Sequence, residues 1–288
     1  MIIDCHYHYY SDEFQIPEKL KSMDEAGIDR IALIPSVSVD FPSDPEKPIM
    51  RFMRFLFGKR TLYPLLRKLM VTFNGDGINI TGRHYPIYFH PNNEVVFAAA
   101  EKAPDRLYSY VFVNPDLQSQ EELCTEIERY AKRKTFCGVK AHPFYHQYST
   151  GKLEGVCEIL DSIHKPLLIH MDFEAKDEIL RLADRHPTVN FLLAHCAFPY
   201  YELLWPELRK RKNVYVDISS GCYVDGKTAL LAVKSLGADH VLYGSDGPYG
   251  TRLPDGTFNM QAEYTWATRA LPVNVLQAVC AENFLSLQ

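Results

Sequence analysis

The first eleven residues read Met1-Ile2-Ile3-Asp4-Cys5-His6-Tyr7-His8-Tyr9-Tyr10-Ser11. Their apolar start and alternating side chains predict a buried β-strand, which we place at Met1–His8. An open, doubly wound parallel sheet normally follows its first strand with a glycine-rich turn. This chain has two tyrosines and a serine at that point, so its opening favours a closed barrel over the doubly wound alternative.

Seven further strands are predicted, and helical patterns lie between most of them. The other strands are Arg30–Pro35, Leu107–Asn114, Cys137–His142, Pro166–His170, Val189–His195, Val214–Ser219 and His240–Asp246. The helices are Pro17–Ala26, Asn93–Lys102, Gln120–Lys132, Leu153–Ile163, Ala175–Arg185, Lys227–Leu236 and Asn274–Leu287. Such alternation implies a parallel sheet, and the mean spacing of about 34 residues per strand suits a barrel of ~250 residues. We therefore predict one α/β domain over residues 1–288, a (β/α)₈ TIM barrel.

Residues 40–92 form an interval too long for one helix, and we predict an inserted helical cap or lid there, after the second strand. Within it, Ile49–Phe73 carries six basic and no acidic residues. Its apolar residues recur roughly at helical spacing. One interpretation is a membrane-surface or anion-binding helix pair. We favour a cap packed over the barrel mouth, because inserted loops of this kind lie beside the active site of such barrels.

The composition is that of an ordinary globular protein, with 47% hydrophobic and 23% charged residues. The formal net charge of −5 gives no electrostatic reason to expect nucleic-acid binding. The seven cysteines are scattered without CxxC spacing, which argues against a disulfide framework and fits a reducing cytosol. The start lacks a signal-peptide layout and no run of 18 apolar residues occurs, so we expect a cytoplasmic protein without membrane spans.

The first strand carries two histidines two residues apart. Side chains alternate faces along a strand, so His6 and His8 point the same way. Asp4 shares that face one layer deeper, and a supporting role beside a metal ligand is possible for it. Cys5 alternates to the other face, which makes it a poor candidate nucleophile.

Three further strands each end in an imidazole or a carboxylate: His170, His195 and Asp246 follow apolar runs. Buried strands gain no stability from such groups. A divalent metal explains them, because imidazole and carboxylate suit zinc and similar ions. Each could instead be a strand-end group that bonds to a loop or caps a turn, but the set together favours a metal site.

The strand-end motifs occur in order along the chain. They are Ile3-Asp4-x-His6-x-His8, Gly138-Val139-Lys140-x-His142-Pro143, Leu168-Ile169-His170, Leu193-Ala194-His195, Val216-Asp217-x-Ser219 and Tyr243-Gly244-Ser245-Asp246. This series resembles the amidohydrolase superfamily, and most of all the amidohydrolase-related branch that includes aminocarboxymuconate-semialdehyde decarboxylase. The resemblance runs nearly end to end and is weakest over residues 40–92.

The resemblance implies that His6, His8, His170 and Asp246 hold one divalent ion, zinc first and manganese as the alternative. It makes His195 the general acid/base beside a metal-activated water. That role suits imidazole, which titrates near neutral pH. Asp246 would be a metal ligand, an acceptor for the proton of that water, or both.

Four other residues near these motifs have predicted roles. Lys140 and His142 share a strand face and are predicted to bind an anionic group of the substrate. Some superfamily members carboxylate this lysine to bridge two metals, but the resemblance to the mononuclear branch favours substrate contact. His142 could equally be a buried strand-end group. Tyr9 is predicted to line the mouth and to contact the substrate, and Asp217 to make strand-end hydrogen bonds.

The predicted function is that of a metal-dependent hydrolase that acts on an amide, ester or lactone of a small organic substrate. The alternative is a nonoxidative decarboxylase of an aromatic or dienoic acid, which needs a basic group that the sequence does not place. A third possibility is an inactive barrel that acts as a binding protein. The family resemblance suggests a homodimer, with no nucleic-acid or membrane partner.

Overall fold

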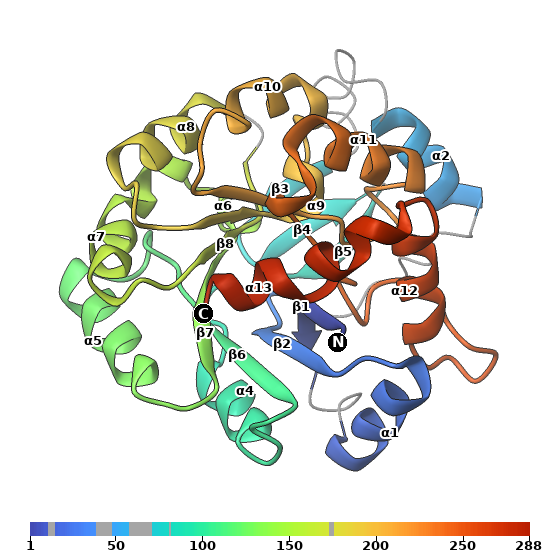
Figure 1. The fold of residues 1–288 in the computed structure, drawn as a ribbon. Helices are drawn as coiled ribbons and strands as arrows, with labels where there is room; N and C mark the ends of the chain where they lie inside the picture. Colours follow the sequence, from blue (N-terminus) through green and yellow to red (C-terminus); the bar gives the residue numbers. More distant parts are fainter. Residues whose placement is uncertain (11–14, 39–47, 58–70, 81, 173–175) are drawn as a thin grey trace.

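The computed structural model describes residues 1–10, 15–38, 48–57, 71–80, 82–172 and 176–288 (Figure 1). One sheet has the strand order β1-β2-β6-β7-β8-β9-β10-β11, and each printed pairing in it is parallel. These strands are β1 (Ile3–Tyr9), β2 (Arg30–Pro35), β6 (Leu107–Phe112), β7 (Phe136–Ala141), β8 (Leu167–Ile169), β9 (Phe191–Leu193), β10 (Val214–Asp217) and β11 (Val241–Leu242). The eight predicted strands are confirmed.

The two edge strands approach each other through backbone hydrogen bonds. The Cys5 N–H donates to the Tyr243 carbonyl at 3.1 Å, and the Asp246 N–H donates to the His6 carbonyl at 2.8 Å. The sheet is thereby a nearly closed barrel, and the predicted (β/α)₈ architecture is confirmed.

Helices surround the barrel in Figure 1. The longer ones are α1 (Ile16–Ala26), α4 (Asn93–Ala100), α5 (Gln120–Ala131), α7 (Glu154–Ile163), α8 (Lys176–Arg185), α11 (Gly226–Leu236) and α12 (Met260–Arg269). Shorter pieces are α6 (Pro143–His146), α9 (Ala194–Ala197), α10 (Trp205–Leu208), α13 (Asn283–Ser286), a π-helical turn at Ala278–Glu282, and 3₁₀ turns at Thr150–Leu153, Tyr201–Leu203, Ala238–His240 and Val273–Val275. Among the described residues, no helix combines the length and apolarity that crossing a bilayer requires.

The core has two layers because strand residues alternate. In β2, Ile31 and Leu33 pack outward against the helices, whereas Ala32 and Ile34 belong to the cluster inside the barrel. Phe284 of α13 joins the inner cluster, so the C-terminal helix covers one end of the barrel. The opposite end, where the strands finish, remains available for a site.

Strand β1 contains a bulge that changes its alternation. Asp4 pairs with Ile31 and Tyr7 with Leu33, so one extra residue of β1 lies between these pairs. Cys5 therefore packs in the inner cluster, and the prediction that it faces away from the barrel interior is wrong. The bulge leaves His6 and His8 together on the wall of one cavity.

The insertion after β2 is only partly helical. Its helix α2 (Pro48–Phe57) is followed by an antiparallel sheet of β3 (Val71–Asn74), β4 (Gly77–Ile80) and β5 (Arg83–Pro86). The hairpin between β3 and β4 closes at the two residues Gly75-Asp76. Most of the basic stretch, over 58–70, lies outside the described residues, and so does 39–47.

Candidate active site

One cavity lies at the ends of the barrel strands, and strand-end side chains from both halves of the chain form its wall. It is lined by His6, His8, Val37, Met50, Lys140, His142, Tyr145, His170, His195, Ser220, Cys222, Tyr223, Asp246 and Tyr249. Helix α2 contributes Met50, and its Arg54 donates to the carbonyl of Gly221, which lies in the chain between the lining residues Ser220 and Cys222. These two contacts place α2 beside the cavity, and the covering of the mouth by the whole insertion stays a prediction.

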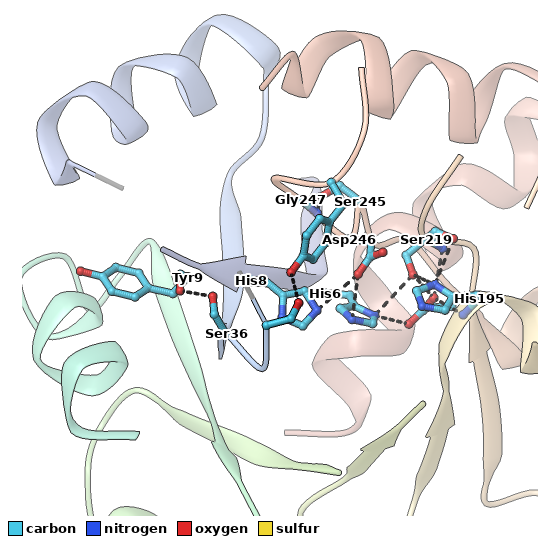
Figure 2. A network of polar contacts seen from close by, with 12 residues as sticks. His6, His8, Tyr9, Ser36, His195, Ser219, Ser245, Asp246 and Gly247 are labelled. Atoms are coloured by element: carbon cyan, nitrogen blue, oxygen red, sulfur yellow. Dashed lines mark hydrogen bonds and ion pairs between the residues drawn. The ribbon is translucent and has the colours of Figure 1, made fainter. Parts of the chain in front are cut away.

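Two histidines and a carboxylate come together on this wall (Figure 2). Asp246 Oδ1 lies 3.3 Å from His6 Nε2 and 3.4 Å from His8 Nε2. The three ligand atoms all lie within 4.8 Å of one another. His6 Nε2 is buried and has no hydrogen-bond partner among the described residues. Two imidazole nitrogens and a carboxylate oxygen match the donor set of a divalent ion, so these residues fit the predicted metal.

His170, the fourth predicted ligand, lines the same cavity but is not in that three-residue group. Its Nδ1 donates to the Met171 carbonyl at 3.1 Å, which leaves the Nε2 lone pair available. Its ring lies 5.1 Å from that of His195. Its place as a metal ligand therefore stays a prediction, although its hydrogen bonding suits one.

Asp217 connects a predicted ligand to the predicted acid/base. Its Oδ2 accepts a hydrogen bond from His6 Nδ1 at 2.9 Å, which turns His6 Nε2 towards Asp246. Its Oδ1 accepts from the backbone N–H groups of His195 at 2.8 Å and Ser219 at 3.0 Å. The predicted strand-end hydrogen bonding of Asp217 thus includes a carboxylate–histidine pair of the kind that orients metal ligands.

The imidazole of His195 is held in one tautomer by Ser219. Its Nδ1 lies 2.8 Å from Ser219 Oγ and 3.3 Å from the Ser219 carbonyl oxygen. The Ser219 hydroxyl donates its own hydrogen to Asp217, so both neighbours of Nδ1 are acceptors. Nδ1 therefore carries the hydrogen and Nε2 keeps a lone pair. This arrangement fits a proton-transfer role, which stays a prediction.

The backbone adopts uncommon conformations at the two predicted catalytic residues. His195 has φ +55° and Asp246 has φ +60°, both in the left-handed region that side chains other than glycine rarely adopt. Such conformations cluster at functional sites because surrounding contacts must hold them. Gly244 permits the close approach of this segment to β1, since a Cβ there would lie only 2.8 Å from the His6 Cβ.

Burial and neighbouring charges set the protonation of the site. Burial lowers the pKa of His6 and of His8, so both rings stay neutral and can offer lone pairs. Burial alone would raise the pKa of the Asp246 carboxyl, but the surrounding histidines outweigh it and hold that pKa below its ordinary value. Burial raises the pKa of Asp4 to about 7, while hydrogen bonds from Ser245 oppose the shift.

Lys140 is a buried cation beside the ligand group. Its side chain is fully buried, and Nζ has no hydrogen-bond partner among the described residues. Burial lowers its pKa to about 8, and the charges of Asp217 and Asp246 oppose that shift. The amine is therefore mostly protonated at pH 7, with unused donors in the wall of the cavity.

Tyr9 is not among the cavity residues, and Figure 2 shows its ring pointing away from His6 and His8. Its role as a substrate contact stays a prediction. The cavity instead receives Tyr145, Tyr223 and Tyr249, which the sequence analysis did not single out. Tyr249 follows Asp246 by three residues, and that spacing is the only signal in the sequence that points to it.

Comparison with known families identifies the class of protein. The family model described as amidohydrolase matches residues 3–283. The chain belongs to this family, which confirms the resemblance seen in the strand-end motifs. A comparison with curated proteins finds no match.

Solved structures of similar fold include a dihydroxybenzoic acid decarboxylase from Polaromonas sp. JS666 with bound manganese and the inhibitor 2-nitroresorcinol (14% identity, TM-score 0.62, 99% of this chain and 96% of that one). Another is 5-carboxyvanillate decarboxylase from Novosphingobium aromaticivorans, complexed with manganese and 4-hydroxy-3-methoxy-5-nitrobenzoic acid (14%, 0.62, 100% and 95%). A third is an uncharacterized TIM-barrel protein from Bordetella bronchiseptica (13%, 0.67, 99% and 97%). At these sequence identities, the similarity between this chain and the three structures shows that they share a fold and nothing further.

Proposed function

We propose that this amidohydrolase-family protein is a metal-dependent decarboxylase of a small aromatic or dienoic carboxylic acid. The observation that carries the proposal is the full burial of Lys140, whose Nζ has no hydrogen-bond partner among the described residues. An ammonium group without a partner is costly to bury, so a bound anion would recover the lost interaction. The decarboxylases among the solved structures of similar fold support the same choice.

The proposed metal site consists of His6, His8 and Asp246, with His170 as the fourth ligand. A divalent ion bound there would supply a Lewis acid that holds and polarises an oxygen of the substrate. The donor set admits zinc, and manganese occurs in two of the similar structures. Asp217 holds His6 by Nδ1, which leaves Nε2 for a metal ion that would bind there.

The remaining chemistry falls to residues of the chain. Lys140 holds the carboxylate, and the aromatic rings of the cavity exclude water around it. The bond between the carboxylate and its carbon breaks, carbon dioxide leaves, and the electron pair stays on that carbon. We assign transfer of the replacing proton to His195. Its Nδ1 hydrogen is fixed by Ser219 and burial lowers the pKa of the ring to about 4, so Nε2 holds only a lone pair at rest. Nε2 would therefore take up a proton from solvent and pass it to that carbon, which returns the ring to its neutral form.

A hydrolase of an amide, ester or lactone is the second candidate, since a metal beside His195 also suits attack by water. The deciding experiment incubates the metal-loaded protein with panels of acids, esters, lactones and amides in ¹⁸O-labelled water. Carbon dioxide release without ¹⁸O in the remaining product supports the decarboxylase. Incorporation of ¹⁸O without carbon dioxide overturns it in favour of the hydrolase.

Variants then test the residues. Lys140→Met should raise KM for the acid by ~10-fold or more, because a charged hydrogen bond is lost. The matched control is Lys134→Met, since the Lys134 side chain is 70% exposed and pairs with Asp105 at the surface. His195→Asn suits the left-handed backbone and should keep the metal while lowering kcat ~100-fold. Stoichiometric metal with no turnover of any panel member would instead support the binding-protein alternative.

A further inference from the structure

Two imidazole rings stack in the cavity wall. One accepts a backbone hydrogen bond at its Nδ1, and the other donates one from its Nδ1. His142 and His170 have ring centroids 4.2 Å apart and planes 10° from parallel. The other face of His142 stacks on Tyr145, with centroids 4.2 Å apart and planes 1° from parallel. His142 is thereby fixed between two rings, and both histidines line the cavity.

The backbone assigns the hydrogen of each ring. His142 Nδ1 accepts from the Tyr145 N–H at 3.1 Å, because His142 caps the first turn of α6. An accepting Nδ1 has no hydrogen, so a neutral ring must carry it on Nε2. His170 Nδ1 faces the Met171 carbonyl oxygen, an acceptor, so that ring carries its hydrogen on Nδ1. The stacked pair therefore offers the Nε2 lone pair of His170 and the Nε2–H group of His142.

We infer that His142 is a specificity-determining donor: its Nε2–H binds an acceptor oxygen of the substrate, beside the carboxylate that Lys140 holds. Among the described residues, the His142 ring makes its hydrogen bond through Nδ1 and none through Nε2, and the ring lines the cavity. Lys140 lies near the end of β7, His142 directly follows that strand, and both side chains line the cavity. This inference rests on the proposed function for the carboxylate, but the hydrogen-bond pattern of His142 stands without it.

The substrate class follows from these two donors. Lys140 selects an anionic group, and His142 selects a second oxygen with a lone pair, such as a carbonyl, carboxylate or phenolate oxygen. An acid with only C–H groups at that position leaves a buried donor unpaired, and such sites discriminate strongly against it. His142 also cannot serve as a metal ligand through Nε2 in this tautomer, which separates its role from that of His170.

The first test is ¹⁵N NMR of histidine-labelled, zinc-loaded protein, with long-range proton–nitrogen correlations that report which ring nitrogen carries hydrogen. We expect the hydrogen of His142 on Nε2 and that of His170 on Nδ1, so each ring is the control for the other. A hydrogen on Nδ1 of His142, or a doubly protonated His142 at pH 7, overturns the inference.

The second test compares binding of 2-oxobutyrate and butyrate to the zinc-loaded protein by calorimetry. The two acids differ by one acceptor oxygen, and the metal's own preference is the same in wild type and variants. His142→Phe keeps the stacking and should lower the preference for 2-oxobutyrate ~10-fold. His142→Gln, which restores an N–H donor, should recover part of it. An unchanged preference in both variants overturns the inference.

His164→Asn is the control for histidine replacement, since this exposed residue occupies a left-handed position that asparagine tolerates. It should leave the preference between the two acids unchanged. Circular dichroism and zinc content verify that each variant is folded. Neither test needs turnover, so absence of carbon dioxide release would overturn the proposed function while the donor role of His142 is still decided.

Discussion

Replacement of Lys140 by methionine should stabilise the metal-free protein at neutral pH. Burial lowers the pKa of this fully buried lysine from 10.5 to about 8. Each unit of pKa shift corresponds to ~1.4 kcal/mol, so the protonated amine costs the folded state on the order of 3 kcal/mol below pH 8. Methionine has a similar length and carries no charge, so Lys140→Met removes this cost without leaving a cavity.

The pH dependence gives the sign of the effect. Between pH 8 and the unfolded value of 10.5, the unfolded chain binds more protons at this site than the folded chain. The free energy of unfolding contributed by Lys140 therefore rises with pH across this window. The advantage of Lys140→Met is full below pH 8 and disappears as pH approaches 10.5.

Urea denaturation at pH 7 and at pH 10 measures both free energies of unfolding. The expected result is a variant more stable by ~3 kcal/mol at pH 7 and by much less at pH 10. Lys134→Met, at an exposed position, should change stability by less than ~0.5 kcal/mol at pH 7. A destabilised Lys140→Met variant at pH 7 would mean that the folded protein already pairs this ammonium, and the case for a substrate carboxylate would lose its basis.

Three further substitutions test the rest of the site and the scaffold. Asp217→Asn should weaken zinc affinity ~10- to 100-fold, measured by competition with a chelator, because His6 loses its carboxylate partner; unchanged affinity would exclude that role. Gly244→Ala should also weaken zinc binding, since its Cβ would displace His6, and a variant that binds zinc like the wild type would contradict the close approach. Burial opposes the protonation of His186, which lies away from the cavity, but the hydrogen bonds that its ring donates to the carboxylates of Asp161 and Glu154 outweigh burial and raise its pKa. The stability that the charged His186 contributes is full below the unfolded pKa of ~6.5 and disappears as pH rises through the folded value. His186→Asn should therefore lower the free energy of unfolding by ~1–3 kcal/mol at pH 6 and by clearly less at pH 9. An equal loss at both pH values would refute the ionic contribution.

The elements that the sequence predicted well are those with a local signal. Strands such as Arg30–Pro35 are apolar runs buried on both faces, and α5 begins with a capping box at Ser119 that the sequence itself contains. Helix α12 and the sheet β3-β4-β5 were not predicted. The apolar pattern of the insertion suggested helices, whereas in the structure the chain reverses at Gly75-Asp76 and pairs as a hairpin.

The sequence by itself determined the barrel and the identity of the strand-end groups, because parallel strands place their last side chains at one end whatever the details of packing. Only the tertiary structure decided how these groups act. The bond from His6 to Asp217 joins residues 211 positions apart, and the bulge in β1 moved Cys5 into the barrel. Whether Lys140 has a partner, and which nitrogen of His142 carries the hydrogen, depends on neighbours supplied by other strands and loops. Local residue patterns contain no information on such contacts.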